Sequence, residues 1–84
     1  MRELLSQKEQ RQLKILEYLF ENPDWIYLDD LSKTIGHNAR IIKSDIKELR
    51  EIFPDFDIRH STAGIMMVNT KNNGIERIYQ YFLQ

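Results

Sequence analysis

Residues 28–50, LDDLSKTIGHNARIIKSDIKELR, contain the pattern that decides the fold. Apolar side chains of this stretch, with Phe53 just after it, recur at the spacing of one helical face in two successive series: Leu28, Leu31 and Ile35, then Ile42, Ile46, Leu49 and Phe53. Between the two series, Gly36 is suited to end one helix and Asn38 to cap the next. The stretch therefore predicts two helices joined by a tight turn, the second of which ends before Pro54.

The second of these helices, about residues 39–52, also carries basic side chains at helical spacing on a side away from its apolar face: Arg40, Lys43, Lys47 and Arg50. We call these four residues the basic stripe. Packing does not require such a stripe, and a helix held by its apolar face with cations turned outward has the plan of a DNA recognition helix. The alternative is a solvated helix face, on which Glu48 and Glu51 pair with neighbouring cations.

The bulk composition describes one small domain over residues 1–84, with a hydrophobic content of 42% that is enough for a single core. Lysine and arginine number 12 against 13 acidic residues, so the formal net charge is −1. Because the chain is nearly neutral, DNA binding requires a local separation of charge. The chain has no cysteine, no apolar run that could span a bilayer and no secretory signal at its start. We therefore expect a cytoplasmic protein.

The N-terminal third of the chain predicts another helix and a connector. Ser6 and Glu9 form a capping box, so a helix is expected from there to about Glu21, before Pro23. Its polar side is expected to include Glu9, Arg11, Lys14 and Glu17. Residues 25–27 are β-prone but too short to stand alone, so we expect an extended connector that pairs with a later strand.

The segment after Pro54 predicts a hairpin. Residues 56–60 alternate apolar and polar side chains as a half-buried strand does, and residues 65–68 form a second β-prone run. Gly64 can adopt a positive φ in the turn between them, so residues 56–68 predict a β-hairpin. The predicted fold is therefore mainly α with a small β-hairpin. It is a winged helix-turn-helix with a three-helix core, a two-stranded wing and a C-terminal connector helix.

The connector helix is predicted from apolar residues at helical spacing near the end of the chain: Ile75, Ile78, Tyr79 and Phe82. This apolar side is larger than so small a core is expected to cover, so exposed apolar surface is predicted at Tyr79 and Phe82. The chain itself is expected to be the N-terminal fragment of a longer protein. The other helices supply the residues predicted to be buried: Leu13, Leu16, Phe20, Leu31, Ile35, Ile42, Ile46 and Leu49.

The central stretch also follows a longer pattern, Leu28-x-x-Leu31-Ser32-x-x-Ile35-x-x-Asn38-x-Arg40-x-Ile42-x-x-Asp45-Ile46-x-x-Leu49. This pattern resembles the N-terminal helix-turn-helix of the Mga-like bacterial transcriptional regulators, which are related to DeoR-type winged helices and to activators with phosphotransferase-regulated domains. The hairpin at residues 64–65 and the helix over residues 75–83 extend the resemblance over nearly the whole chain. The resemblance implies a DNA-binding domain at the start of a regulator several times longer, which is dimeric in its full length.

Three positions depart from the usual family pattern. Ser32 stands where alanine is common, His37 where a small apolar residue is common, and Ile41 where threonine is common. We assign no specific contact to Ile41.

The candidate DNA-binding residues are Asn38, Arg40, Lys43, Ser44, Lys47, Arg59, His60 and Thr62. Docking geometry places the N-terminal half of a recognition helix nearest the bases, so Arg40 is expected to bind guanine and Ser44 a base or a phosphate. Lys43 and Lys47 are expected to contact phosphate, as are the N-termini of the second and third helices. Asp45 is expected to be an internal hydrogen-bond or ion-pair partner, because a carboxylate facing DNA would repel phosphate.

Two functions stay open from the sequence. The first is binding to double-stranded DNA, with the third helix in the major groove and the wing on the backbone. The second is a winged-helix module that binds another protein without contacting DNA, for which an exposed Ile41 leaves room. The sequence shows no nucleophile elbow, phosphate loop or spaced carboxylate pair, and His37 and His60 have no ligand cluster near them. We therefore expect no enzyme activity, metal or cofactor.

Overall fold

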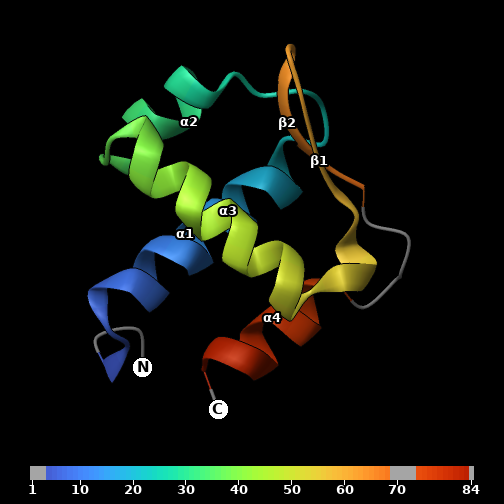
Figure 1. The fold of residues 1–84 in the computed structure, drawn as a ribbon. Helices are drawn as coiled ribbons and strands as arrows, with labels where there is room; N and C mark the ends of the chain where they lie inside the picture. The colour runs from blue at the N-terminus through green and yellow to red at the C-terminus, as the bar shows by residue number, and fades with distance from the viewer. Residues whose placement is uncertain (1–3, 69–73, 84) are drawn as a thin grey trace.

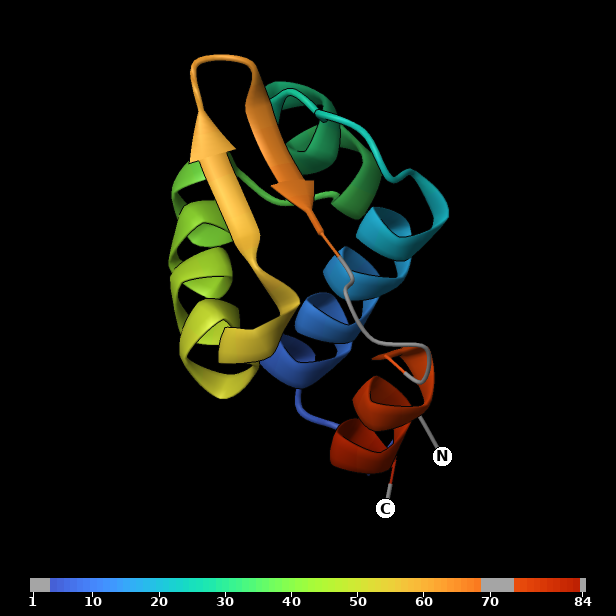
Figure 2. The same cartoon turned by 90° about the vertical axis from the view of Figure 1, so that its right-hand side faces the viewer.

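A two-stranded hairpin lies beside the third of three packed helices, and a fourth helix lies at the end of the molecule away from the hairpin tip (Figure 1, Figure 2). The computed structural model describes residues 4–68 and 74–83. In this part of the chain the elements are α1 (Gln7–Glu21), α2 (Leu28–Ile35), α3 (Ala39–Ile52), a 3₁₀ turn (Pro54–Phe56), β1 (Ile58–Ser61), β2 (Gly64–Met67) and α4 (Gly74–Phe82). This order confirms the predicted winged helix-turn-helix. No helix of the described part has the length and apolar content needed to cross a membrane.

Three helix ends are set by residues adjacent to them in the sequence. Ser6 and Glu9 form the predicted capping box: Ser6 Oγ accepts from the Glu9 N–H at 3.1 Å, and Glu9 Oε1 accepts from the Ser6 N–H at 3.2 Å. Gly36 follows α2 with a φ of 87°, a conformation that glycine adopts readily. Asn38 Oδ1 accepts from the Ile41 N–H at 3.0 Å and caps α3. The tight turn between α2 and α3 therefore follows from local chemistry.

The first wing strand begins later than predicted. Phe56 belongs to the 3₁₀ turn, and its fully buried ring stacks on Phe53, with centroids 4.8 Å apart, and meets Phe20 edge-on at 6.0 Å. Because this ring packs into the core, the backbone turns at Asp57, whose φ is 45°, before strand pairing starts at Ile58. The hairpin is confirmed, but the prediction of a strand beginning at Phe56 was wrong.

The connector between α1 and α2 is attached to the wing. Ile26 and Ile65 form an antiparallel bridge, in which each N–H donates to the other residue's carbonyl at 2.8 Å. This bridge confirms the expectation that residues 25–27 pair with a later strand. Since β1 and β2 are themselves antiparallel, with His60 opposite Ile65, the connector lies on the far side of β2 from β1.

A single hydrophobic core is formed by residues from every element. Six of the eight residues predicted to be buried are buried: Leu13, Leu16, Leu31, Ile42, Ile46 and Leu49. The other two, Phe20 and Ile35, are partly buried and pack against that core. The core therefore fixes which side of α3 faces inward, and this in turn fixes the side that faces solvent.

The fourth helix is covered more fully than the sequence predicted. Ile78 and Phe82 are 0% and 4% exposed, and the partly buried Tyr79 donates its hydroxyl hydrogen bond to Glu17 of α1. Because α4 packs against α1, the predicted exposure of Phe82 was wrong (Figure 2). Tyr81, which the sequence did not single out, is 51% exposed.

Candidate nucleic-acid interface

One side of α3 holds the helix to the core, and the basic side faces solvent. Ile42, Ile46 and Leu49 are buried, whereas the whole basic stripe and Ser44 are exposed. Within residues 4–68 and 74–83, no cation of the stripe has an ion-pair partner. The structure therefore does not show the alternative in which glutamates of α3 neutralise the stripe.

A groove of about 340 Å³ separates α3 from the wing. Its lining residues are Lys43, Ile46, Lys47, Arg50, His60 and Ile65. Ile46 and Ile65 are buried and form an apolar floor, whereas the exposed side chains above them are cationic or, at His60, polar. The basic stripe and the wing therefore share one concave surface.

A second hollow, of about 510 Å³, adjoins this groove and extends to the N-terminus of α2. Lys43 and His60 line both hollows. The other charged or hydroxyl-bearing side chains of the second hollow are those of Tyr27, Asp29, Asp30, Lys33, Ser61 and Thr62. We call the two adjoining hollows the α3–wing face. This surface brings together four of the residues predicted from the sequence: Lys43, Lys47, His60 and Thr62.

Arg59 lies on the opposite side of the wing from His60, because successive strand residues point to opposite faces. Arg59 is opposite Met66, and its Nε and Nη2 donate to Asp57 Oδ2 at 3.0 and 2.8 Å. The hydrogen bonds to Asp57, and the charge of that carboxylate, raise the pKa of Arg59. The structure thus separates Arg59 from the α3–wing face and places its charge beside a carboxylate.

The N-terminal end of α3 holds the remaining predicted residues. Arg40 is exposed and lies outside both hollows, and Asn38 is exposed with its side-chain oxygen engaged in the helix cap. Ile41 is partly buried, so the expectation that it is exposed was wrong. Two of the residues that depart from the family pattern are joined by a hydrogen bond: the Ser32 hydroxyl donates to the His37 carbonyl across the α2–α3 turn.

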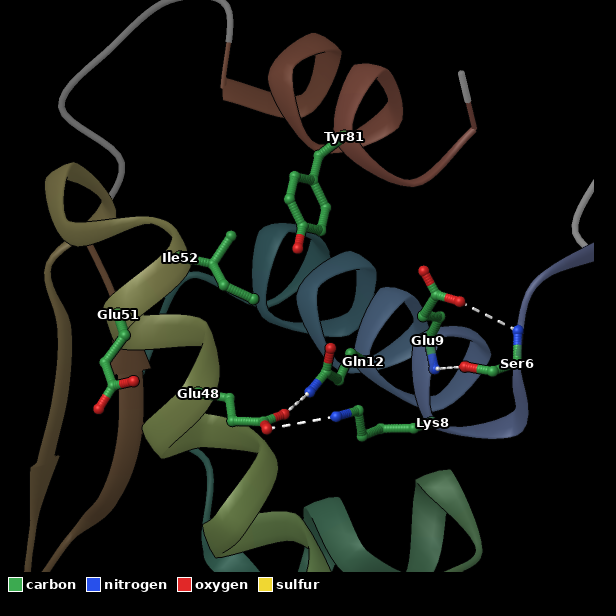
Figure 3. A pocket seen from close by; sticks show the side chains of 8 residues that line it. All are labelled: Ser6, Lys8, Glu9, Gln12, Glu48, Glu51, Ile52 and Tyr81. Carbon is green, nitrogen blue, oxygen red and sulfur yellow. Dashed lines mark hydrogen bonds and ion pairs between the residues drawn. The ribbon is translucent and has the colours of Figure 1, made fainter.

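A polar network behind the basic stripe joins α3 to α1. Asp45 is 2% exposed and accepts hydrogen bonds from Nε and Nη2 of Arg11, the latter at 2.9 Å. Gln12 Nε2 donates to Asp45 Oδ1 at 3.4 Å and to Glu48 Oε2 at 2.6 Å, and Lys8 Nζ lies 3.3 Å from Glu48 Oε1. Figure 3 shows the part of this network at Gln12, Lys8 and Glu48. The prediction of an internal partner role for Asp45 is confirmed.

The charges of this network stabilise one another. The hydrogen bond to Asp45 raises the pKa of Arg11, and the hydrogen bond from Gln12, assisted by Lys8, lowers the pKa of Glu48. The sequence placed Arg11 on the polar side of its helix, but the structure leaves its side chain only 15% exposed. The adjacent polar residues Arg11 and Gln12, at the border of an apolar helix side, are the sequence signal for this contact.

Three packed helices, a wing and an exposed basic side on the third helix define a winged helix-turn-helix domain. Residues 6–65 match the family model described as the M protein trans-acting positive regulator (MGA) HTH domain, and the chain belongs to that family. This confirms the family resemblance seen in the sequence. The family is a class of regulators and not a class of enzymes.

A longer bacterial regulator contains a similar segment. The chain is 38% identical over 84 residues to the Streptococcus pneumoniae serotype 4 protein named "Putative trans-acting regulator". The match covers 100% of this chain and 17% of that protein. The chain therefore spans about a sixth of the length of this relative.

Proposed function

We propose that this domain binds double-stranded DNA as the reader domain of a transcriptional regulator, with α3 in the major groove and the wing on the backbone. The observation that carries the proposal is the exposed basic stripe, whose cations have no ion-pair partner within the described residues. Cations that the protein does not neutralise are available to phosphates and to base edges. Membership of a family of trans-acting regulators supports the same function.

The outward side of α3 argues against the alternative, a protein-binding module without DNA contact. The large hydrophobic residues that are exposed in the described part of the chain are Leu4, Trp25, Tyr27 and Tyr81. None of them belongs to α3, and Ile41 is partly buried. A protein partner that docks on α3 would meet cations and Ser44, which is unlike the apolar centre of protein interfaces.

Different residues of this surface are proposed to contact different parts of the DNA. Arg40, at the start of α3, is assigned to a base edge, and Ser44, one turn later, to a base or a phosphate. Lys43 and Lys47, which line the α3–wing groove from the α3 side, are assigned to phosphates. The wing residues His60 and Thr62 are assigned to the backbone. Arg59 reaches DNA only on the outer side of the wing, and Asn38 acts through the N-terminus of α3 that it caps.

Alanine substitutions in the stripe should separate base contacts from phosphate contacts. After selection of bound sequences from a random DNA pool, Arg40→Ala should reduce discrimination at one base pair by about 1–3 kcal/mol. Lys43→Ala and Lys47→Ala should weaken binding to all sequences alike. Competition binding with single-base variants of the selected duplex measures both effects.

Lys14→Ala is a matched control for these variants, because Lys14 is an exposed lysine of α1 that lies outside the α3–wing face. It should leave affinity and discrimination unchanged. Equal losses on every sequence for all three stripe variants would refute the assignment of Arg40 to a base edge.

Binding by the 84-residue chain should be weak and strongly dependent on salt. About 3–4 phosphate contacts predict a slope of log K against log salt near −3 to −4, with a dissociation constant of about 10⁻⁴–10⁻⁶ M at physiological salt. Fluorescence anisotropy with a short duplex at several salt concentrations measures the slope. The double variant K43A/K47A should make the slope less negative by about 2. If the chain fails to bind even at low salt, the DNA-binding proposal is wrong and the protein-binding alternative replaces it.

The longer protein is proposed to bind DNA as a dimer. One reader domain engages one half-site, and two linked domains gain affinity by binding both half-sites together. We further propose that such a regulator acts in the cytoplasm, where bacterial DNA is accessible to it.

A further inference from the structure

The N-terminus of α2 brings negative charge onto the surface proposed to bind DNA. Asp29 and Asp30 are both exposed and line the second hollow of the α3–wing face, which also contains Lys43 and the wing-tip residue Thr62. Neither carboxylate has an ion-pair partner in residues 4–68 or 74–83, and Lys33, one turn away on the same helix, is not within ion-pair distance.

This arrangement divides the α3–wing face into two parts of opposite charge. On the α2 side the two carboxylates outnumber Lys33, whereas α3 contributes three cations of the basic stripe to this face, Lys43, Lys47 and Arg50. A free helix N-terminus attracts phosphate through its N–H groups and its dipole. Here the carboxylates of Asp29 and Asp30 supply that negative charge themselves, so a phosphate approaching the end of α2 meets repulsion. The phosphate contact expected from the sequence at this helix end is therefore disfavoured.

We propose that Asp29 and Asp30 exclude the DNA backbone from the α2 side of the face. This exclusion confines the duplex to α3 and the wing and lowers the affinity for non-specific DNA. This inference rests on the proposed DNA-binding function. Non-specific complexes are held mainly by backbone charge and sample many positions on a basic surface. A local negative charge disfavours some of these binding positions and does not alter the contacts of the residues assigned to base edges. Asp29 and Asp30 thus restrict the orientation of the DNA on this face.

The test compares the wild-type chain with the double variant D29N/D30N on a short duplex of mixed sequence at low salt. Asparagine keeps the size of each side chain and removes its charge. The variant should bind about three- to tenfold more tightly, and its log K should fall more steeply with log salt. Amide chemical-shift changes on adding DNA should spread from α3 and the wing in the wild type to residues 28–31 in the variant.

The double variant E21Q/E76Q is the matched control, since Glu21 and Glu76 are exposed glutamates of α1 and α4 outside both hollows. It removes the same charge and should change affinity much less. A purely structural role at the end of α2 predicts a lower melting temperature for D29N/D30N with no gain in affinity.

Three other results would overturn the inference. Equal affinities for the wild type and D29N/D30N contradict it and leave DNA binding itself intact. Equal gains for D29N/D30N and E21Q/E76Q assign the effect to net charge rather than to the α2 side. Absence of binding by every protein contradicts the proposed function and this inference together.

Discussion

Replacing Asp45 with alanine is expected to lower the free energy of unfolding by about 3–5 kcal/mol. The side chain is 2% exposed and accepts two hydrogen bonds from Arg11, whose own side chain is 15% exposed. The substitution leaves that guanidinium without its partner in a site from which water is largely excluded. A domain of this size has a total stability of about 4–12 kcal/mol, so the variant should be partly or wholly unfolded at moderate temperature. Urea denaturation followed by circular dichroism measures the change.

A double variant separates the free-energy cost of leaving Arg11 unpaired from the cost of losing the Asp45 side chain itself. Removing both charges in R11M/D45L should restore most of the stability, because a buried ion pair replaced by apolar side chains is often neutral. Lys14→Ala, an exposed change on the same helix as Arg11, should alter stability by less than about 0.5 kcal/mol. A loss below about 1 kcal/mol for Asp45→Ala would show that the Arg11 contact does not hold α3 to α1.

Replacing Gly64 with alanine is expected to destabilise the chain by about 3 kcal/mol or more. Gly64 has a φ of 120°, and a Cβ placed on it would lie 2.1 Å from the carbonyl oxygen of Ile26. The strained φ accounts for about 1–3 kcal/mol, and loss of the two hydrogen bonds between Ile26 and Ile65 adds about 0.5–1.5 kcal/mol for each. Thermal denaturation measures the total loss of stability. Faster hydrogen exchange of the Ile26 and Ile65 amide protons would show that the loss arises at their bridge.

Gly36→Ala is the matched control, because Gly36 also has a positive φ, 87°, but nothing lies within 4 Å of the added Cβ. It should cost only the left-handed backbone penalty of about 1–2 kcal/mol. If the two alanine variants lose equal stability, the close approach of the connector to the wing contributes nothing.

Sequence reasoning succeeded where the deciding interactions are local. The helix ends at Ser6, Gly36 and Asn38 depend on contacts within a few residues, so their residue types are enough to place them. The same holds for the exposure of the basic stripe, because the apolar periodicity of α3 fixes which side turns outward. The exposure of the stripe could therefore be predicted without knowledge of the tertiary structure, whereas its contacts with DNA stay predictions.

Sequence reasoning failed where an outcome depends on how distant segments pack. The alternation at residues 56–60 fits a strand, but the ring of Phe56 stacks on Phe53, and the strand begins two residues later, at Ile58. Arg11 and Asp45 are 34 positions apart, and their pairing depends on the crossing of α1 and α3. Phe82 is covered because α4 packs against α1, which a helical pattern alone does not specify.

The bridge between Ile26 and Ile65 attaches the wing to the connector between α1 and α2. The core and Asp45 fix the orientation of α3, and the wing is held both by that core and by the attachment of β2 to a connector that precedes the helix-turn-helix in the chain. A change in the length or sequence of residues 22–27 is therefore expected to change the position of the wing relative to α3. Under the proposed DNA-binding function, the length of this connector would set the spacing between the contacts of α3 and those of the wing.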